Sequence, residues 1–446
     1  MEYFAVLTVA TAIIVALALA LYRRRRDLGM LAGTAALYYW SLFGAWYIVI
    51  DKTGGFSGKN YHYLELKLFP IVLDRNYMLT LGLYAGFLIA VQVTMLTVLS
   101  RRRQRPTPRL VLRHGPILTA GFTAGFGSFL LIHHKLSLAW ALNTSAYSYT
   151  RAQTDQWFTL HQVLNRVALL PPAIGFAALM AGNRSRYFVN VRRRYTLAAY
   201  ALLFLGMGAF TFVLGNKNEV LVALLAGVLA YTASVRRPRL LRASLVLAAG
   251  FWFLYAIDLF RAVPVTEIKQ AVIGRLGQST QVASFMASSN EAYAAHFSLY
   301  GVLAGNVKPR FGYSLYALVC SVIPRVVWPS RPLDIYFYYS ESVGAIQNQG
   351  YSVHHATGWY LNFGIPGVAL GGIALGWVWA YCLNAHQRIR PASGLFFRLF
   401  ATVAPWLFVA YLPPLIRAGP EGYKGLVIEA FLIPVGTLAL ACRPKK

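Results

Sequence analysis

Long apolar runs recur from one end of this chain to the other, and they constrain its fold more than any other feature. Of the 446 residues, 57% are hydrophobic and only 13% are charged, whereas a soluble domain carries about 25% charge. Many of the runs approach the roughly 20 residues that an α-helix needs to cross a bilayer. The sequence therefore predicts an all-α polytopic membrane protein.

About eleven runs are long and apolar enough to be read as transmembrane helices. The first run precedes its arginines and is followed by no small-residue cleavage site, so we expect a retained span rather than a signal peptide. We expect the whole chain, 1–446, to form a single integral membrane domain. The expected spans lie near residues 4–22, 28–50, 77–99, 115–133, 157–181, 196–214, 220–235, 243–260, 358–383, 395–412 and 425–442.

Positive charge gathers in short loops between these runs. More than half of the 42 lysines and arginines lie in six clusters, which are accompanied by one acidic residue, Asp27. The positive-inside rule places these loops in the cytoplasm, with the N-terminus outside and the C-terminus inside. Because such loops are too short to form a basic face on a folded module, we expect membrane lipids and no nucleic acid as partners. The clusters fall at 23–26, 101–113, 184–194, 236–242, 388–390 and 443–446.

The outward loops differ greatly in length. Residues 51–76 and 134–156 form two moderate loops, whereas 261–357 form one of about a hundred residues, far above the usual length. We expect this long loop to have its own structure or function. Within it, 270–300 permits a helix, and 315–327 is apolar enough to lie on the membrane surface or to re-enter it.

Several common catalytic signatures are missing from the chain. It has no Walker loop, no HExxH, no GxSxG and no D-x-D pair. Its three cysteines, Cys320, Cys382 and Cys442, indicate neither a disulfide framework nor a cysteine-based metal site. We therefore expect no metal and no cofactor, and a substrate that is already activated.

Candidate phosphate ligands are the cations on the outer side. Arg325 and Arg331 lie in IPRVVWPSRP, where prolines restrict the backbone, and Arg275 lies in the same loop. Guanidinium groups bind phosphate oxygens bidentately, so this cluster suits a lipid-linked diphosphate. Alternatively, these arginines contact lipid headgroups or pair with acidic residues of the loop.

Two further cations lie in or near the spans. Lys217 belongs to GNKNE, a tight outer turn where the backbone can approach a ligand, although it could simply be solvated and pair with Glu219. Arg166 lies about nine residues into the fifth span, where a charge is costly and usually functional. If that span begins deeper, Arg166 is interfacial.

Candidate proton acceptors are His354 and His355, just before the ninth span. An imidazole near its ordinary pKa of about 6.5 suits removal of a proton from a sugar hydroxyl. A structural role is the alternative, with Glu291 and Glu341 as rival bases. Candidate substrate-binding residues beside them are Tyr351, Asn362 and Trp328.

The run from IPRVVWPSRP to GWYLNFGIPG resembles the Wzy-type polymerases of oligosaccharide repeat units, which are relatives of the O-antigen ligases. GNKNE resembles the family's Gly-x-Arg helix opening, with Lys217 in place of the usual arginine, and Arg275 resembles an upstream loop arginine. Trp359 departs from the pattern, because many relatives carry Glu there. The motifs span roughly 200–380, and the matching positions are Ile323, Pro324, Arg325, Trp328, Pro329, Arg331, Pro332, Asn362, Phe363, Gly364 and Gly367.

The resemblance implies a GT-C-like, metal-independent glycosyltransferase of the bacterial cytoplasmic (inner) membrane, with most of its active site in the periplasmic loop 261–357. Donor and acceptor would be undecaprenyl-diphosphate-linked oligosaccharides, polymerised for O-antigen, capsule or exopolysaccharide with release of undecaprenyl diphosphate. A chain-length regulator is a candidate partner. The arginines would stabilise the leaving diphosphate.

Two alternatives remain open. An O-antigen ligase, or another lipid-linked sugar transferase, would differ only in its acceptor. A transporter or flippase for lipid-linked oligosaccharides belongs to another class and would favour internal repeats and polar residues along a central path. The sequence shows no repeat. The proline pairs Pro171–Pro172 and Pro413–Pro414 could interrupt helices, however, so the transporter hypothesis stays open.

Overall fold

The computed structural model describes residues 1–52, 73–99, 109–135, 156–191, 194–214, 218–235, 240–260, 267, 291–323, 327–344, 352–389 and 393–444. It is mostly helical. Among the described residues, six helices are long and apolar enough to cross a membrane. The mostly helical fold is thereby confirmed, and the six helices are compatible with a membrane protein, while the count of about eleven spans stays a prediction.

A helix occupies each of the eleven expected ranges, usually within a few residues of the expected ends. The second range is helical throughout but includes a π-helical turn, η1, and the eleventh includes another, η6. The helices are α1 (Glu2–Arg25), α2 (Leu28–Tyr38), η1 (Tyr39–Phe43), α3 (Gly44–Lys52), α5 (Arg75–Val98), α6 (His114–Lys135), α9 (Gln156–Ala181), α10 (Thr196–Val213), α11 (Asn218–Ser234), α12 (Leu240–Phe260), α18 (His355–Asn384), α19 (Leu395–Ile416), α20 (Gly422–Gly425), η6 (Leu426–Leu432) and α21 (Ile433–Ala441).

The chain divides into two compact units, each built from separate stretches of sequence. Unit 1 comprises Met1–Arg101, Gln278–Cys382 and Tyr411–Leu426. Unit 2 comprises Arg102–Gly277, Leu383–Ala410 and Val427–Lys446.

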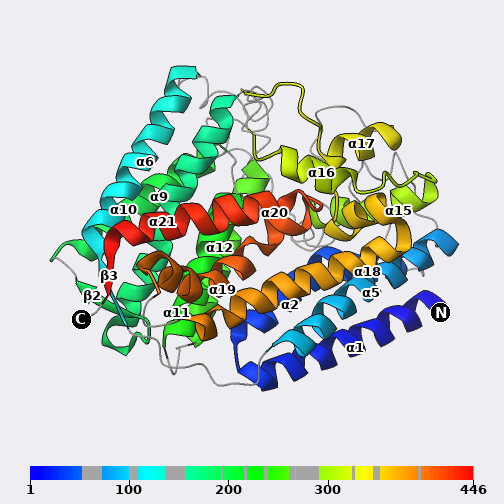
Figure 1. The fold of residues 1–446 in the computed structure, drawn as a ribbon, viewed down its shortest axis with the longest axis horizontal. Coiled ribbons are helices and arrows are strands. Elements are labelled where there is room, and N and C mark those ends of the chain that lie inside the picture. The colour runs from blue at the N-terminus through cyan, green and yellow to red at the C-terminus, as the bar shows by residue number, and fades with distance from the viewer. Residues whose placement is uncertain are drawn as a thin grey trace. The chain divides into compact units, whose positions relative to one another are not determined.

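In unit 1, α1, α5 and α18 lie side by side (Figure 1). Two glycines one turn apart, Gly372 and Gly376, let α18 approach α5 closely. A Cβ on Gly372 would lie 2.6 Å from the backbone oxygen of Phe87. Small residues at this spacing allow helix backbones to pack together in a membrane, where no hydrophobic effect drives association.

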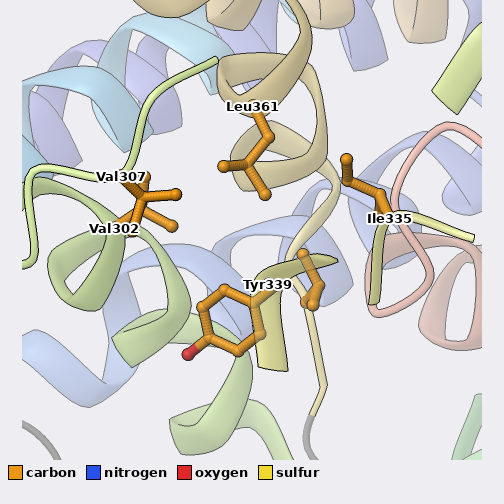
Figure 2. Packing of buried hydrophobic residues seen from close by; sticks show 6 residues of the cluster. Val302, Val307, Ile335, Tyr339 and Leu361 are labelled. Atoms are coloured by element: carbon orange, nitrogen blue, oxygen red, sulfur yellow. The ribbon is translucent and has the colours of Figure 1, made fainter. Parts of the chain in front are cut away.

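The described part of the long loop contains three helices, α15 (Glu291–Ala304), α16 (Tyr313–Cys320) and α17 (Ile335–Ser342). An apolar cluster joins α15 and α17 to the first turns of α18, as Figure 2 shows. Its members, none more than 8% exposed, are Val302, Val307, Ile335, Tyr339, Val353 and Leu361. By contrast, Tyr316, Val319 and Val327 in and after α16 are 56%, 71% and 74% exposed. The prediction that 315–327 contacts the membrane surface fits this exposure but stays a prediction.

In unit 2, α9 packs against α6 and α11, and three basic loops meet in a small sheet of order β2-β1-β3. Its strands are β1 (Leu110–Arg113), β2 (Phe188–Val191) and β3 (Cys442–Pro444). β1 pairs parallel with β2 and antiparallel with β3. The sequence analysis did not foresee this sheet, to which each loop supplies one strand, and the expectation that the loops offer no basic face to nucleic acid stays a prediction.

Candidate functional site

The expected site residues are distributed unevenly. Arg275, Arg325, Lys217 and Tyr351 lie outside the described residues, and Glu291 is the first residue of α15. His354, His355, Asn362, Trp328 and Arg331 belong to unit 1, whereas Arg166 belongs to unit 2.

His354 is fully buried and has a partner at each ring nitrogen. Its Nδ1 accepts the backbone N–H of Ala356 at 3.0 Å, so Nε2 carries the proton and donates to Ser41 Oγ at 3.0 Å. Ser41 lies in η1, and its backbone oxygen accepts from Nδ1 of a second buried imidazole, His296. Tyr77 donates to the other nitrogen of His296. The π-helical turn is thus held by two neutral histidines.

Burial also changes the acidity of these two imidazoles. It lowers the pKa of His296 to about 4 and that of His354 well below its ordinary value, with His355 and His296 adding to the effect on His354. Both rings are therefore neutral near pH 7. The sequence-based expectation of an imidazole near its usual pKa does not hold for His354. A role in proton transfer stays a prediction.

His355 connects the loop after α19 to the start of α18. Its Nδ1 donates to the backbone oxygen of Gly419 at 2.8 Å, and its Nε2 accepts from Trp359 Nε1 at 3.1 Å. Gly419 belongs to the segment 417–425, which follows α19 and which we call the Glu421 loop. Trp359, the departure from the family pattern, thus holds the tautomer of the adjacent histidine.

The Glu421 loop presents a carboxyl group that sequence reasoning did not single out. Oε1 of Glu421 accepts the N–H of Ile335, the first residue of α17, at 2.9 Å. Oε2 is buried and has no hydrogen-bond partner in the described part of the chain. Burial, with a smaller contribution from Asp334, raises the pKa of Glu421 to about 8, although its backbone hydrogen bonds oppose the shift. A strongly perturbed carboxyl of this kind is a candidate acid or base.

A second unsatisfied group lies in the same loop. The hydroxyl of Tyr423 is buried without a hydrogen-bond partner among the described residues. Its ring meets His355 edge-on, with centroids 5.2 Å apart. The available sequence signal was the short segment RAGPEGYKG between the tenth and eleventh expected spans, with one carboxylate between Arg417 and Lys424.

Exposed cations lie along the segment that precedes α16. Lys308 and Arg310 are both exposed. The Arg310 guanidinium stacks over the ring of Tyr338 in α17, 3.9 Å from its centroid, and Tyr338 donates to the backbone oxygen of Lys308 at 2.6 Å. The cation–π contact fixes the guanidinium plane while leaving its edge open to an anion.

Arg331 and Trp328 shape the turn before α17. Nη1 of Arg331 donates to the backbone oxygens of Ser321 and Ile323, each at 2.8 Å, and so holds the segment before α17 against the end of α16. Trp328 Nε1 donates to Ser330 Oγ at 3.2 Å. Arg331 therefore has a structural role in this structure, and its binding of diphosphate stays a prediction.

Asn362 is fully buried and connects α18 to the start of α16. Its Oδ1 accepts the Ser314 N–H at 2.9 Å, and its Nδ2 donates to Ser314 Oγ and to the Gly358 backbone oxygen. Two residues later, Gly364 adopts φ +67° and ψ −150°, which breaks the helix. Only glycine takes such backbone angles readily. The expected Asn-Phe-Gly turn is thus a break inside α18.

Arg166 forms ion pairs with two carboxylates in unit 2. It contacts Glu429, which lies in η6, and its Nη2 is 3.8 Å from Oε1 of Glu219. Glu219 is 2% exposed, and its pairing with a cation is expected in an apolar bundle. A role for Arg166 in binding diphosphate stays a prediction.

Comparisons of the chain with models of protein families, with curated proteins and with solved structures find no match.

Proposed function

We propose that this protein polymerises lipid-linked oligosaccharide repeat units, with undecaprenyl diphosphate as the leaving group, at the outer face of the bacterial cytoplasmic membrane. The proposal combines the motif resemblance with the chemistry of the residues around α17. Donor and acceptor are both lipid-linked, so neither has to leave the membrane.

The observation that carries the proposal is that a carboxyl group and a cation, from two different segments, both contact one short helix, α17. Glu421 binds the backbone of Ile335, and Arg310 stacks on Tyr338, three residues later in α17. Both groups therefore contact α17, one at its first residue and the other about one turn later. One glycosyl transfer needs both a proton acceptor and an anion ligand, and these two groups could supply them.

In the proposed reaction, an acceptor hydroxyl attacks the anomeric carbon of the growing chain. The new C–O bond forms as the bond between that carbon and the diphosphate breaks, and the diphosphate leaves as an anion. Arg310 and Lys308, with Arg325, Arg331 and Arg275, stabilise the developing negative charge. The hydroxyl proton passes to a base, for which the unsatisfied oxygen of Glu421 is a better acceptor than the doubly hydrogen-bonded His354 or His355.

The test uses the purified full-length protein with undecaprenyl-diphosphate-linked repeat units, a chelator and no nucleotide. We expect a ladder of longer glycans for the wild type and its loss in Glu421→Gln, Arg310→Gln and Arg325→Ala. Glutamine retains an oxygen that can accept from Ile335, so the Glu421 variant should keep its fold. Glu2→Gln, which changes an exposed carboxyl in the first turn of α1, is the matched control and should form the ladder normally.

Other outcomes would overturn the proposal in distinguishable ways. A single transfer that requires a finished lipid-core acceptor would identify a ligase. If neither product forms and the labelled lipid-linked glycan crosses the bilayer of sealed vesicles, the protein is a transporter. A normal ladder from Arg310→Gln and Arg325→Ala would remove the arginines from diphosphate binding.

A further inference from the structure

The three-stranded sheet of unit 2 has one face turned toward the protein and one turned away from it. Leu110, Leu112, Phe188 and Cys442 are buried. Because side chains alternate along a strand, the residues between them face the other way. The strand register aligns Val111 with Val189 on one side and with Arg443 on the other, and aligns Arg113 with Val191.

Exposed arginines lie in the strands of the sheet and in the chain directly beside them. Arg443 is exposed on β3, Arg109 immediately precedes β1, and Arg184 and Arg186 precede β2. Arg194 follows β2 and stacks on Tyr195. The loop segments 102–113, 182–195 and 442–446 contain no aspartate or glutamate. The sheet therefore concentrates positive charge that no acidic residue of these segments neutralises.

Exposed apolar side chains accompany the arginines. Val191 is 52% exposed, Tyr195 71% and Leu197 56%. Arginines mixed with aromatic and aliphatic side chains are typical of surfaces that lie in the headgroup region of a bilayer. An acidic protein partner would need the charges but would leave these apolar groups without a matching surface.

The sheet also lies where a membrane surface is expected. β1 leads directly into α6, β3 follows α21, and β2 lies between α9 and α10. The strands therefore join the ends of the apolar helices of unit 2. Helices that cross a bilayer end in its headgroup region, so strands attached to their ends lie within reach of lipid phosphates.

From this geometry we propose that the outward face of the sheet is a binding surface for anionic phospholipid headgroups. The arginines bind lipid phosphates, and Val191, Tyr195 and Leu197 enter the boundary between headgroups and acyl chains. The occupant is the leaflet in which unit 2 is embedded. This surface is independent of the proposed glycosyl transfer, and its test does not require any activity.

The test places a fluorophore on the full-length protein at Val191→Cys, since all three native cysteines are buried. The labelled protein is reconstituted in phosphatidylcholine vesicles of two kinds. One contains a trace of phosphatidylglycerol with a quencher on its headgroup, and the other contains a trace of phosphatidylcholine with the same quencher. We expect phosphatidylglycerol to quench more strongly at low salt. Added salt should abolish the difference, because screening weakens contacts between exposed charges.

Two charge variants decide whether the sheet causes the enrichment. In Arg109→Gln/Arg186→Gln/Arg443→Gln, the preference for phosphatidylglycerol should weaken by about fivefold for each arginine, from roughly 1 kcal/mol per basic residue at an anionic surface. The control Arg23→Gln/Arg26→Gln/Arg75→Gln removes the same charge from unit 1 and should keep the preference. Equal quenching by the two lipids in the wild type would overturn the proposal. The proposal would also be overturned if both variants lost the preference for phosphatidylglycerol equally, or if an added acidic peptide bound to the sheet and abolished the quenching by lipid.

Discussion

Replacing Asn362 with alanine tests whether this buried residue serves the fold or the substrate. The α16 helix begins after Gly312, which has no side chain to cap it. The first N–H groups of any helix lack partners within the helix. Asn362 supplies the missing acceptor from α18, because its Oδ1 binds the N–H of Ser314. Asn362→Ala therefore removes the cap of α16.

The size of the effect follows from the lost hydrogen bonds. Ser314 is fully buried, so its N–H would be left unsatisfied at a cost of about 1–3 kcal/mol. Loss of the bond from Nδ2 to the Ser314 hydroxyl adds about 1 kcal/mol. Together these terms lower the free energy of opening α16 by about 2–4 kcal/mol, which corresponds to amide exchange at Ser314 about 30- to 1,000-fold faster.

Hydrogen exchange of the full-length protein, read by mass spectrometry over α16, measures this directly. Ser314→Ala is the matched control: it removes the hydroxyl but keeps the amide bond to Asn362, so exchange should rise tenfold at most. Unchanged exchange in Asn362→Ala, together with lost glycosyl transfer, would refute the capping argument and assign Asn362 to the substrate.

If Glu421, with a pKa of about 8, is the base, the transfer rate should rise about tenfold per pH unit below pH 8 and level off above it. The residual transfer rate of Glu421→Gln should be independent of pH. The same carboxyl binds more protons in the folded than in the unfolded chain, so the wild type should lose stability in thermal melts as pH rises from about 4.5 to 8, and Glu421→Gln should not. Conversely, the lowered pKa of His296 should reduce stability by up to about 1.4 kcal/mol per pH unit as pH falls from 6.5 toward 4, a slope that His296→Gln should remove. Gly372→Leu should prevent α18 from packing on α5 and yield aggregated protein in size-exclusion chromatography. Gly82→Leu, whose new Cβ would meet no atom within 4 Å beyond its chain neighbours and its own helix backbone, should remain monodisperse.

The helices were predictable from sequence because the bilayer sets their length and composition. A run of about 20 apolar residues has few stable alternatives in a membrane, where every backbone group needs an internal partner. For this reason the expected range 77–99 nearly coincides with α5, Arg75–Val98. The break at Gly364 was also predictable as a turn, since Asn362, Phe363 and Gly364 form an Asn-Phe-Gly motif and glycine adopts positive φ angles readily.

The sheet and the Glu421 loop were not predictable, because each depends on partners far away in the chain. Leu112 pairs with Cys442 across more than 300 residues, in strands of four and three residues that are too short to show a period of two. Glu421 meets Ile335 across 86 residues. The burial that neutralises His354 arises from the same tertiary packing, so sequence position alone could not place its pKa.

The buried histidines and the Glu421 loop differ in how well their polar groups are satisfied. His354 and His355 are completely buried, yet each ring nitrogen has a partner, so these side chains meet the requirement that buried polar groups be hydrogen-bonded. Oε2 of Glu421 and the hydroxyl of Tyr423, in one loop, have no hydrogen-bond partner among the described residues, as is also true of Thr34 Oγ1 and Gln92 Oε1 elsewhere in unit 1. An unsatisfied buried oxygen costs about 1–3 kcal/mol, a cost that a purely structural loop could avoid with an apolar side chain. If Glu421 accepts a proton from a sugar hydroxyl, its unsatisfied oxygen serves catalysis. The histidines then have a structural role, because His355 binds the Glu421 loop.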